Sequence, residues 1–352
     1  MKARPDYCAP IVRLLLVHTG GTLMMRTEGR GPLAPEVYTR DLVGELPVLR
    51  KIAEIETRIL YSLDSSDLQP HHWVDMARAI HEAFYSPASE DDADMRYDGA
   101  VIVHGTDTMA YTASALAFLL PGLDRPVILT GSQAPLLDVR TDARANLVDA
   151  CHLATMPIPE VAIAFSSQLL RGCRAKKLDA WGMSAFGSPC CAPLAELGID
   201  AEIASHVLPK RPQRPFDDRI EPRVFMIRTF PGLSPDVLFA ILAQDVRGLV
   251  IEAFGAGNVP RLENSLVPAI EAATKRGVPV VIVSQSPRGA VDLARYQGGV
   301  AAAKAGAISA GDMTSEAALT KLMITLGRLQ GSADVVEDVR KAFAEAPLGE
   351  MD

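Results

Sequence analysis

The fold of this chain is decided by the stretch Ile11-Val12-Arg13-Leu14-Leu15-Leu16-Val17 and by the loop that closely follows it, Thr19-Gly20-Gly21-Thr22. A short and almost continuous apolar run is typical of a strand buried on both faces of a parallel sheet. A second run of this kind, Ala100-Val101-Ile102-Val103, precedes the loop His104-Gly105-Thr106-Asp107-Thr108. Ligands of open α/β sheets bind beyond the carboxyl ends of the strands. We therefore expect the two threonine-bearing loops to meet in one pocket.

Outward from these two strands, the first two-thirds of the chain alternate between short β-rich runs and amphipathic helices. This alternation predicts a mostly parallel sheet with helices on both faces. The expected strands are Val12–Val17, Arg58–Leu63, Gly99–Val103, Pro126–Thr130 and Glu160–Phe165. The expected helices are Pro70–Phe84, Thr108–Leu120 and Thr141–Ala154.

A stretch in which prolines alternate with charged residues, 208–223, predicts a linker. Each proline removes a backbone donor and disfavours helix at the residue before it. A smaller α/β pattern follows, with expected elements Val224–Ile227, Pro235–Ala243, Gly248–Ala253, Leu262–Arg276, Val278–Val283 and two C-terminal helices. The sequence thus predicts a larger N-terminal α/β domain, 1–207, and a smaller C-terminal α/β domain, 224–352.

Composition excludes several classes of partner and cofactor. The chain has 48% apolar and 22% charged residues, a composition typical of globular proteins. Its formal charge of −8 indicates that it lacks the basic surface that nucleic-acid binding requires. No apolar run reaches the roughly 18 residues of a membrane span, and we identify no signal peptide. The five cysteines, Cys8, Cys151, Cys173, Cys190 and Cys191, form no C-x-x-C pair. This usage favours free thiols in a reducing, cytoplasmic compartment and predicts neither a metal nor a cofactor.

Each loop has a structural interpretation beside the functional one. Thr19–Thr22 suits a phosphate-binding or simple turn as well as an active-site loop, because glycine permits close approach. In the second loop, Asp107 or Thr108 suits a helix cap, and this role is compatible with catalysis by Thr106, whose hydroxyl has a carboxylate beside it. Ser65 and Ser66 suit either the cap of the helix from Pro70 or a site for a ligand carboxylate.

A basic cluster, Arg171 to Lys177, follows the strand Glu160–Phe165. Most such clusters are solvated surface, whereas a buried lysine with a lowered pKa can act as a base. The histidines His18, His104 and His152 have no acidic or histidine neighbours at metal-ligand spacing.

Taken in order, these segments resemble the bacterial-type L-asparaginases, most closely the cytoplasmic type I enzymes. The first signature of that family resembles Thr19-Gly20-Gly21-Thr22, and the second resembles the segment from His104 to Leu116 almost letter for letter. The further matching segments are Asp64-Ser65-Ser66-Asp67, Thr130-Gly131-Ser132-Gln133, Arg171 to Lys177 and Gly255-Ala256-Gly257-Asn258. The resemblance covers nearly the whole chain, from about Leu14 to Leu329.

The resemblance implies an amidohydrolase that converts L-asparagine to L-aspartate and ammonia through a threonine acyl-enzyme. Its nucleophile falls on Thr22, and its second catalytic group falls on Thr106, Asp107 and Lys177. The choice of Lys177 over the adjacent Lys176 depends on the alignment and on the spacing from Arg171-Gly172. Substrate binding falls on Asp64, Ser65 and Ser66, together with Thr106 and Asp107, where carboxylates and hydroxyls select an α-amino acid. The resemblance also implies a homodimer or a dimer of dimers.

Two departures from the family pattern concern a lid and regulation. Gly31-Pro32 stand in the segment Arg26 to Pro35, where type I relatives often carry a tyrosine. Regulated relatives bind asparagine at a second site, where this chain carries Lys176, Glu252 and Ser286 instead of the family's residues. This replacement predicts a hyperbolic dependence of rate on asparagine concentration.

Two alternatives remain beside the amidohydrolase. One is the asparaginase-like subunit of a tRNA-dependent amidotransferase, and the other is a non-catalytic protein that binds amino acids. An assay for ammonia release from free asparagine distinguishes the amidohydrolase from both alternatives, because neither is expected to release ammonia from that substrate.

Overall fold

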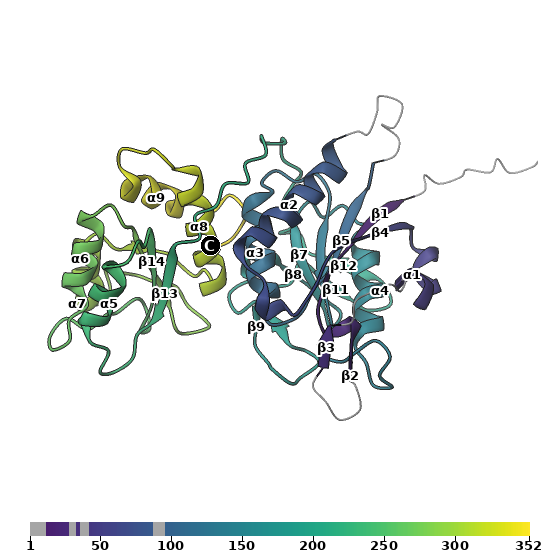
Figure 1. Ribbon diagram of the computed structural model, residues 1–352, viewed down its shortest axis with the longest axis horizontal. Helices are drawn as coiled ribbons and strands as arrows, with labels where there is room; N and C mark the ends of the chain where they lie inside the picture. The colour runs from purple at the N-terminus through teal and green to yellow at the C-terminus, as the bar shows by residue number, and fades with distance from the viewer. Residues whose placement is uncertain (1–11, 28–32, 36–41, 87–95) are drawn as a thin grey trace, which may run out of the picture.

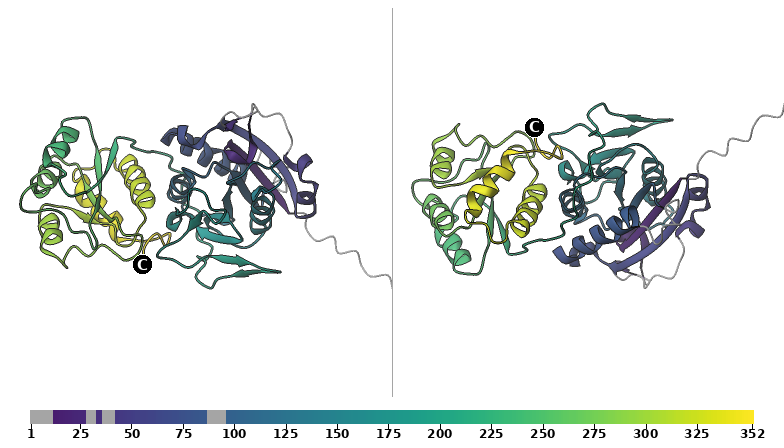
Figure 2. Two further views of the ribbon diagram at one scale, coloured as in Figure 1. Left: turned by 90° about the horizontal axis from the view of Figure 1, so that it is seen from below. Right: turned by 90° about the horizontal axis from the view of Figure 1, so that it is seen from above.

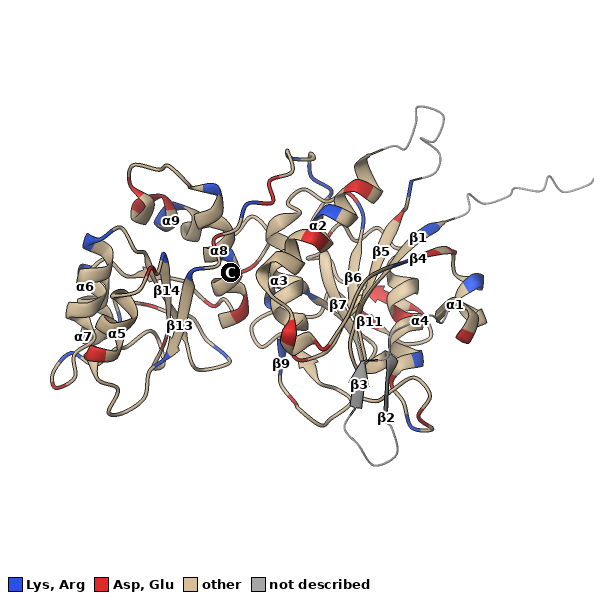
Figure 3. Cartoon of the chain, viewed as in Figure 1, with Lys and Arg blue, Asp and Glu red and all other residues tan. Residues whose placement is uncertain are grey.

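The chain folds into two lobes that lie side by side in three views of the molecule (Figures 1 and 2). The structure, a computed structural model, describes residues 12–27, 33–35, 42–86 and 96–352. The N-terminal lobe is coloured purple to teal, and the C-terminal lobe is green to yellow. The last residues of the chain return to the seam between the lobes. In Figure 3, basic and acidic positions are interspersed over both lobes of the described chain.

The N-terminal lobe is organised around a sheet that has eight strands in the described residues. In spatial order these are β12 (Ala201–Ile203), β11 (Ala195–Leu197), β8 (Gln168–Arg171), β7 (Val161–Phe165), β6 (Val127–Thr130), β5 (Gly99–Val103), β1 (Arg13–Gly20) and β4 (Glu54–Leu63). The pairs from β4 through β7 are parallel. All five predicted strands are present, and their bounds differ from the prediction mainly at β1 and β4.

The order of the parallel strands explains where a site can form. In space they run β4-β1-β5-β6-β7, so the chain starts in the middle, moves to one edge and then returns past β1. The direction of winding reverses between β1 and β5. Such a reversal leaves a crevice between the two connections at the carboxyl ends of the strands, and ligands of open α/β sheets bind there. The two loops singled out in the sequence follow β1 and β5.

The apolar run of β1 is buried on both faces of the sheet, as its composition predicts. Leu15 and Val17 pack on one face with α2 (Pro70–Tyr85) and α3 (Met109–Leu119). Leu14 and Leu16 pack on the other face with α4 (Ala143–Leu153). Alternate side chains of one strand therefore serve two separate cores, which only a central strand can do.

The sequence did not predict the antiparallel side of this sheet. β8, β11 and β12 continue the sheet beyond β7 through antiparallel pairs. These strands have only three or four residues, too few to show a clear apolar alternation. The remaining short elements of this lobe are β2 (Met25–Thr27), β3 (Leu33–Pro35), α1 (Leu42–Glu45), β9 (Lys176–Lys177) and β10 (Phe186–Gly187).

The C-terminal lobe is a parallel sheet of four strands, β13 (Val224–Arg228), β14 (Gly248–Ala253), β15 (Val280–Ser284) and β16 (Ile308–Ser309). Its helices are α5 (Pro235–Leu242), α6 (Val267–Lys275), α7 (Gln297–Lys304), α8 (Ser315–Arg328) and α9 (Val335–Ala344). The prediction of two C-terminal helices was wrong, since three follow β15. The helix predicted from Leu262 begins only at Val267, because Asn264 adopts a positive φ of 55° that a right-handed helix excludes.

The segment 208–223 carries no helix or strand and connects the two lobes. The helix α8 packs against both α3 of the N-terminal lobe and β14 of its own sheet. No helix among the described residues is both long and apolar enough to cross a membrane.

Beyond α9, the chain folds back onto the seam through a buried ion pair. The Glu350 carboxylate is fully buried and lies 2.7 Å from the Lys321 ammonium of α8, which is also buried. Glu350 further accepts a hydrogen bond from the backbone N–H of Leu348, and Lys321 donates to the carbonyl of Glu345. The last turn of the chain is thus fastened by charges that have little access to water.

Glu350→Ala should destabilise the protein by about 3–5 kcal/mol, because it leaves the Lys321 ammonium buried without its counter-ion. The exposed pair Glu271–Lys275 on α6 offers a matched control, and Glu271→Ala should cost less than about 0.5 kcal/mol. Urea unfolding monitored by circular dichroism measures both changes. Equal losses of stability in the two variants would show that the buried ion pair between Glu350 and Lys321 does not hold the end of the chain.

Candidate active site

Three backbone turns meet at the carboxyl edge of the larger sheet, at the point between β1 and β5 where the strand order reverses. We call this position the switch point of the sheet. Gly21 has a φ of 92°, and a Cβ at this position would lie 2.4 Å from the backbone nitrogen of Gly105. A Cβ on Gly105 would in turn lie 2.6 Å from the hydroxyl oxygen of Ser65. The backbone N–H of Gly21 donates to the carbonyl of Leu63 at 3.1 Å. The loops after β1, β4 and β5 are therefore in direct contact, and glycine at two positions is what permits it.

A lysine joins the second loop to a distant part of the chain. The Lys177 ammonium donates to the Thr106 hydroxyl at 2.8 Å and to the Asp107 carboxylate at 2.6 Å. Thr106 is buried, whereas the Asp107 side chain is 66% exposed. The structure thus brings together Thr106, Asp107 and Lys177, which the sequence places about 70 residues apart. The amine between a hydroxyl and a carboxylate can orient the hydroxyl and stabilise negative charge that develops on it.

Thr22 opens a 3-10 turn, Thr22–Met24, directly after Gly21. Its neighbour Gly21 contacts the second loop through the backbone, so Thr22 belongs to the same cluster of turns. Thr19, the other threonine of this loop, lies at the end of β1 and donates its buried hydroxyl to the carbonyl of Val103 at 2.9 Å. Of the two threonines, Thr19 therefore has a structural contact that ties β1 to β5.

The neighbouring lysine points to the other lobe. The Lys176 ammonium lies 2.8 Å and 3.1 Å from the two carboxylate oxygens of Glu316 on α8. Adjacent residues of the two-residue strand β9 project to opposite sides, which is the ordinary geometry of extended backbone. Lys176 and Lys177 therefore cannot both face the second loop.

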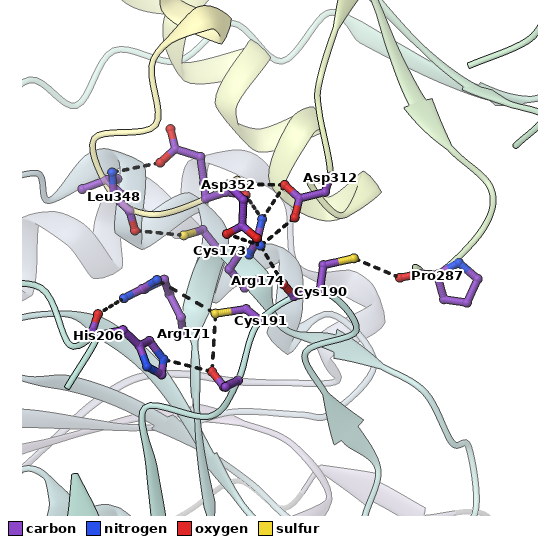
Figure 4. Close-up of polar contacts among 12 residues, drawn as sticks. Arg171, Cys173, Arg174, Cys190, Cys191, His206, Pro287, Asp312, Leu348 and Asp352 are labelled. Carbon is purple, nitrogen blue, oxygen red and sulfur yellow. Dashed lines mark hydrogen bonds and ion pairs between the residues drawn. The ribbon is translucent and has the colours of Figure 1, made fainter. Parts of the chain in front are cut away.

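The basic cluster that contains these lysines is not a solvated surface, as most such clusters are. The Arg171 guanidinium is buried and pairs with Glu160 at 2.6 Å. The Arg174 guanidinium is 2% exposed and pairs with Asp312 of the C-terminal lobe, and it also donates to the backbone carbonyls of Glu350 and Cys190. Figure 4 shows this arrangement, with Arg174 between Asp312 and Asp352. Cys190 and Cys191, which lie in the same region, are free thiols, as the sequence predicts.

The loop after β4 is folded on itself. Asp64 accepts hydrogen bonds from the backbone N–H of Ser66 at 2.9 Å and from its hydroxyl at 2.8 Å. Ser65 is buried against Gly105, and its carbonyl accepts a hydrogen bond from the Thr108 hydroxyl at 2.7 Å. The three residues of this loop that are predicted to bind substrate therefore stand beside the second loop, which carries the other two, Thr106 and Asp107.

The capping interpretations of both loops were wrong. Thr108 precedes α3, but its hydroxyl donates to Ser65 and makes no cap. Asp107 accepts from Lys177. The helix from Pro70 is preceded by Gln69, whose N–H donates to His72, so neither Ser65 nor Ser66 caps it.

A buried histidine supports the second loop from beneath. His104 is fully buried, with Nδ1 2.6 Å from the carbonyl of Gly105 and Nε2 2.9 Å from the Thr112 hydroxyl. A carbonyl only accepts, so Nδ1 carries the proton and Nε2 accepts from Thr112, which itself accepts from the Trp73 indole at 3.1 Å. Burial lowers the pKa of His104 to about 4, against a smaller opposing effect of the Gly105 hydrogen bond. The ring is neutral at pH 7.

Sequence reasoning assigned no role to Gln133, which lies after β6. Its carboxamide oxygen accepts a hydrogen bond from the Thr106 hydroxyl at 3.1 Å. One signal was available in the sequence, because Thr130-Gly131-Ser132-Gln133 follows a predicted strand and so ends at the same edge of the sheet as the two threonine loops.

The three residues predicted to replace a second asparagine site do lie in one place. Lys176, Glu252 and Ser286 line a common pocket between the lobes, together with Arg174 and Arg228. The loss of a second asparagine site stays a prediction. In the segment predicted as a lid, Arg26 to Pro35, residues 28–32 lie outside the described residues, and these include Gly31 and Pro32.

Comparison with known proteins identifies the family. Residues 13–208 match the family model described as "Asparaginase, N-terminal", and residues 223–343 match "Glutaminase/Asparaginase C-terminal domain". The chain therefore belongs to the asparaginase family, as the sequence motifs indicated.

Three relatives illustrate the likeness. The chain is 38% identical to an L-asparaginase of Thermococcus kodakarensis over 97% of this chain and 99% of that protein, and it superimposes on a structure of that enzyme with a TM-score of 0.84. It is 36% identical to L-asparaginase 1 of Escherichia coli, over 96% of this chain and 97% of that protein. It is also 32% identical to one of the subunits of the glutamyl-tRNA(Gln) amidotransferase of Pyrococcus abyssi, over 96% of this chain and 76% of that protein.

At mildly acidic pH, the free energy of unfolding should depend on the protonation of His104. The unfolded chain binds a proton on this ring below about pH 6.5, whereas the folded chain does not bind one until about pH 4. The free energy of unfolding therefore falls as the pH decreases between these values, by at most about 1.4 kcal/mol per pH unit. In a long-range ¹H–¹⁵N spectrum, the His104 ring should remain neutral with its proton on Nδ1 at pH 5. Protonation of all described histidines near pH 6.5 would contradict this.

Proposed function

We propose that this chain is an L-asparaginase, which hydrolyses L-asparagine to L-aspartate and ammonia through an ester of Thr22. The observation that carries the proposal is the placement of the Lys177 ammonium between the Thr106 hydroxyl and the Asp107 carboxylate at the switch point of the sheet. Membership of the family and the nearly full coverage of two L-asparaginases support it.

The reaction needs a nucleophile and a second group that acts on water. Thr22 attacks the carbon of the side-chain amide, and ammonia leaves. Water at the Thr106–Lys177–Asp107 group then attacks the ester and releases aspartate. A covalent intermediate divides one difficult hydrolysis into two easier steps. Backbone N–H groups of the contacting turns are the proposed donors to the oxyanion.

Recognition of the α-amino acid is assigned to the loops after β4 and β5. The Asp107 carboxylate attracts the α-ammonium group, and Asp64 holds the backbone of the substrate loop at Ser66. Ser66 donates both its N–H and its hydroxyl to Asp64, so the Ser65 hydroxyl is the donor of this loop that we assign to the α-carboxylate. Hydrogen bonds from a neutral donor to a charged group contribute about 1.5–3 kcal/mol each, which favours ligands that carry both charges.

The amidotransferase interpretation has weaker support. The relative from Pyrococcus abyssi extends beyond the region that matches, since this chain covers 76% of it, whereas the two L-asparaginases match over nearly their whole length. Binding without catalysis requires no lysine beside Thr106. Release of ammonia from free asparagine distinguishes both alternatives from the proposed function.

Assembly and location belong to the same proposal. The turn between β9 and β10 lies beside the site and exposes Leu178, Trp181 and Met183 to solvent. Exposed apolar groups of this kind mark interaction surfaces, so we propose a homodimer or a dimer of dimers with a contact here. Four free thiols, Cys151, Cys173, Cys190 and Cys191, fit a cytoplasmic location.

The assay of the proposed function measures ammonia release from asparagine. The parent chain should follow a hyperbola in asparagine concentration. Thr22→Ala should fold normally and lose at least about 1,000-fold in kcat, because no other hydroxyl replaces the nucleophile. Thr22→Ser keeps a hydroxyl and should retain part of the activity. If Thr22→Ala hydrolyses asparagine at the rate of the parent chain, another group is the nucleophile.

The lysines of β9 provide a matched pair of variants. Lys177→Met removes the donor to Thr106 and Asp107 and should abolish turnover, whereas Lys176→Met removes only the pair with Glu316 and should retain most of it. Each variant loses one positive charge, and the two positions are adjacent. An effect of net charge alone would therefore lower the turnover of both variants equally. The opposite order of activities would refute the assignment of Lys177.

A further inference from the structure

A second polar contact of the Thr106 hydroxyl comes from the segment after β6. Thr106 Oγ1 accepts a hydrogen bond from the Lys177 ammonium at 2.8 Å and donates one to Gln133 Oε1 at 3.1 Å. A hydroxyl has one proton and two lone pairs. With its proton directed at Gln133 and one lone pair directed at Lys177, Thr106 has a single lone pair left for a donor in the site.

The orientation of the Gln133 carboxamide is determined by its other end. Gln133 Nε2 donates to the carbonyl of Gly182 at 3.1 Å. A carbonyl oxygen only accepts, so the nitrogen must face Gly182 and the oxygen must face Thr106. Gly182 is held in turn, since the Asp179 carboxylate accepts from the backbone N–H groups of Trp181 and Gly182 at 2.8 Å and 2.9 Å. The carboxamide cannot turn over without breaking both of its contacts.

The backbone of Gln133 is fixed as firmly as its side chain. Its N–H donates to both carboxylate oxygens of Asp142, at 3.1 Å and 3.0 Å, and the N–H of Ala134 donates to the same carboxylate at 3.1 Å. Asn146, one turn into α4, donates to Asp142 at 3.1 Å and to the carbonyl of Gly131 at 3.0 Å. The loop after β6 is therefore anchored to the start of α4 on either side of Gln133.

We propose that Gln133 is a positioning residue for the hydrolysis, which fixes the direction of the Thr106 proton and so presents the free lone pair of Thr106 to the reacting water or substrate. This inference rests on the proposed function. Its physical basis is that an oriented acceptor removes the rotational freedom of the hydroxyl before the reaction begins, which is how preorganised sites lower a barrier. Gln133 itself acts through Thr106 and touches no reacting atom in this role.

The test compares two substitutions at Gln133 with the same change elsewhere. Gln133→Met keeps the length of the side chain and removes both hydrogen bonds, so kcat for asparagine should fall about tenfold with little change in KM, the loss expected for one or two neutral hydrogen bonds. Gln244→Met makes the same change at an exposed position of the C-terminal lobe and should leave kcat unaltered.

Gln133→Glu separates the contact with Thr106 from the contact with Gly182. Its carboxylate keeps an acceptor for the Thr106 hydroxyl and has no donor for the carbonyl of Gly182. If the acceptor for Thr106 is what matters, kcat of Gln133→Glu at pH 7 should lie clearly above that of Gln133→Met, whereas a purely structural role through Gly182 would leave both variants equally impaired. Gln133→Leu replaces Gln133→Met in this comparison if the latter fails to fold.

The possible results separate the two proposals. An active parent with unchanged kcat in Gln133→Met, or equal losses of kcat in Gln133→Met and Gln133→Glu, would overturn the role of Gln133 and leave the proposed function standing. A parent without activity on asparagine would overturn the proposed function and the role of Gln133 together.

Discussion

The close contact of three backbone turns at the carboxyl edge of the sheet is the constraint on which the site depends. Gly21, Gly105 and Ser65 lie so near one another that a Cβ on either glycine would overlap its neighbour. The residues adjacent to the contact, Thr22 and Thr106, inherit their positions from it. A strand order that reverses between β1 and β5 makes the contact possible, because it leaves room between the two connections.

The second constraint is that Lys177 comes from outside the parallel part of the sheet. It lies on a two-residue strand that is held by few backbone bonds of its own. The preceding residues are held by ion pairs instead, with Arg171 on Glu160 inside the N-terminal lobe and Arg174 on Asp312 in the C-terminal lobe. The contact between the lobes therefore helps to position the Lys177 ammonium in the site, although the C-terminal sheet itself contributes no residue to the site described above.

Polar networks reach the Thr106 loop from two further directions. His104 supports the backbone at Gly105 from the buried side through Thr112 and Trp73. Gln133 reaches the hydroxyl itself from the loop after β6. Each nitrogen and oxygen of the His104 ring and the Gln133 carboxamide has a hydrogen-bond partner, and a satisfied polar network is rigid in a low-dielectric interior. Rigidity of this kind suits a hydroxyl that must keep one orientation.

The sequence by itself determined the central strands, the two-domain α/β pattern and the family, because apolar runs and glycine-threonine turns are local signals. It also brought Thr22, Thr106, Asp107 and Lys177 forward as candidates through the resemblance. It missed one C-terminal helix, and it missed β8, β11 and β12, since strands of three or four residues carry little periodicity and depend on neighbouring strands for their hydrogen bonds. Only the tertiary structure decided which lysine faces Thr106, why Thr108 ties loops together and makes no cap, and that Gln133 holds the proton of Thr106. Those choices rest on contacts between residues about 27 to 140 positions apart, for which no local pattern in the chain exists.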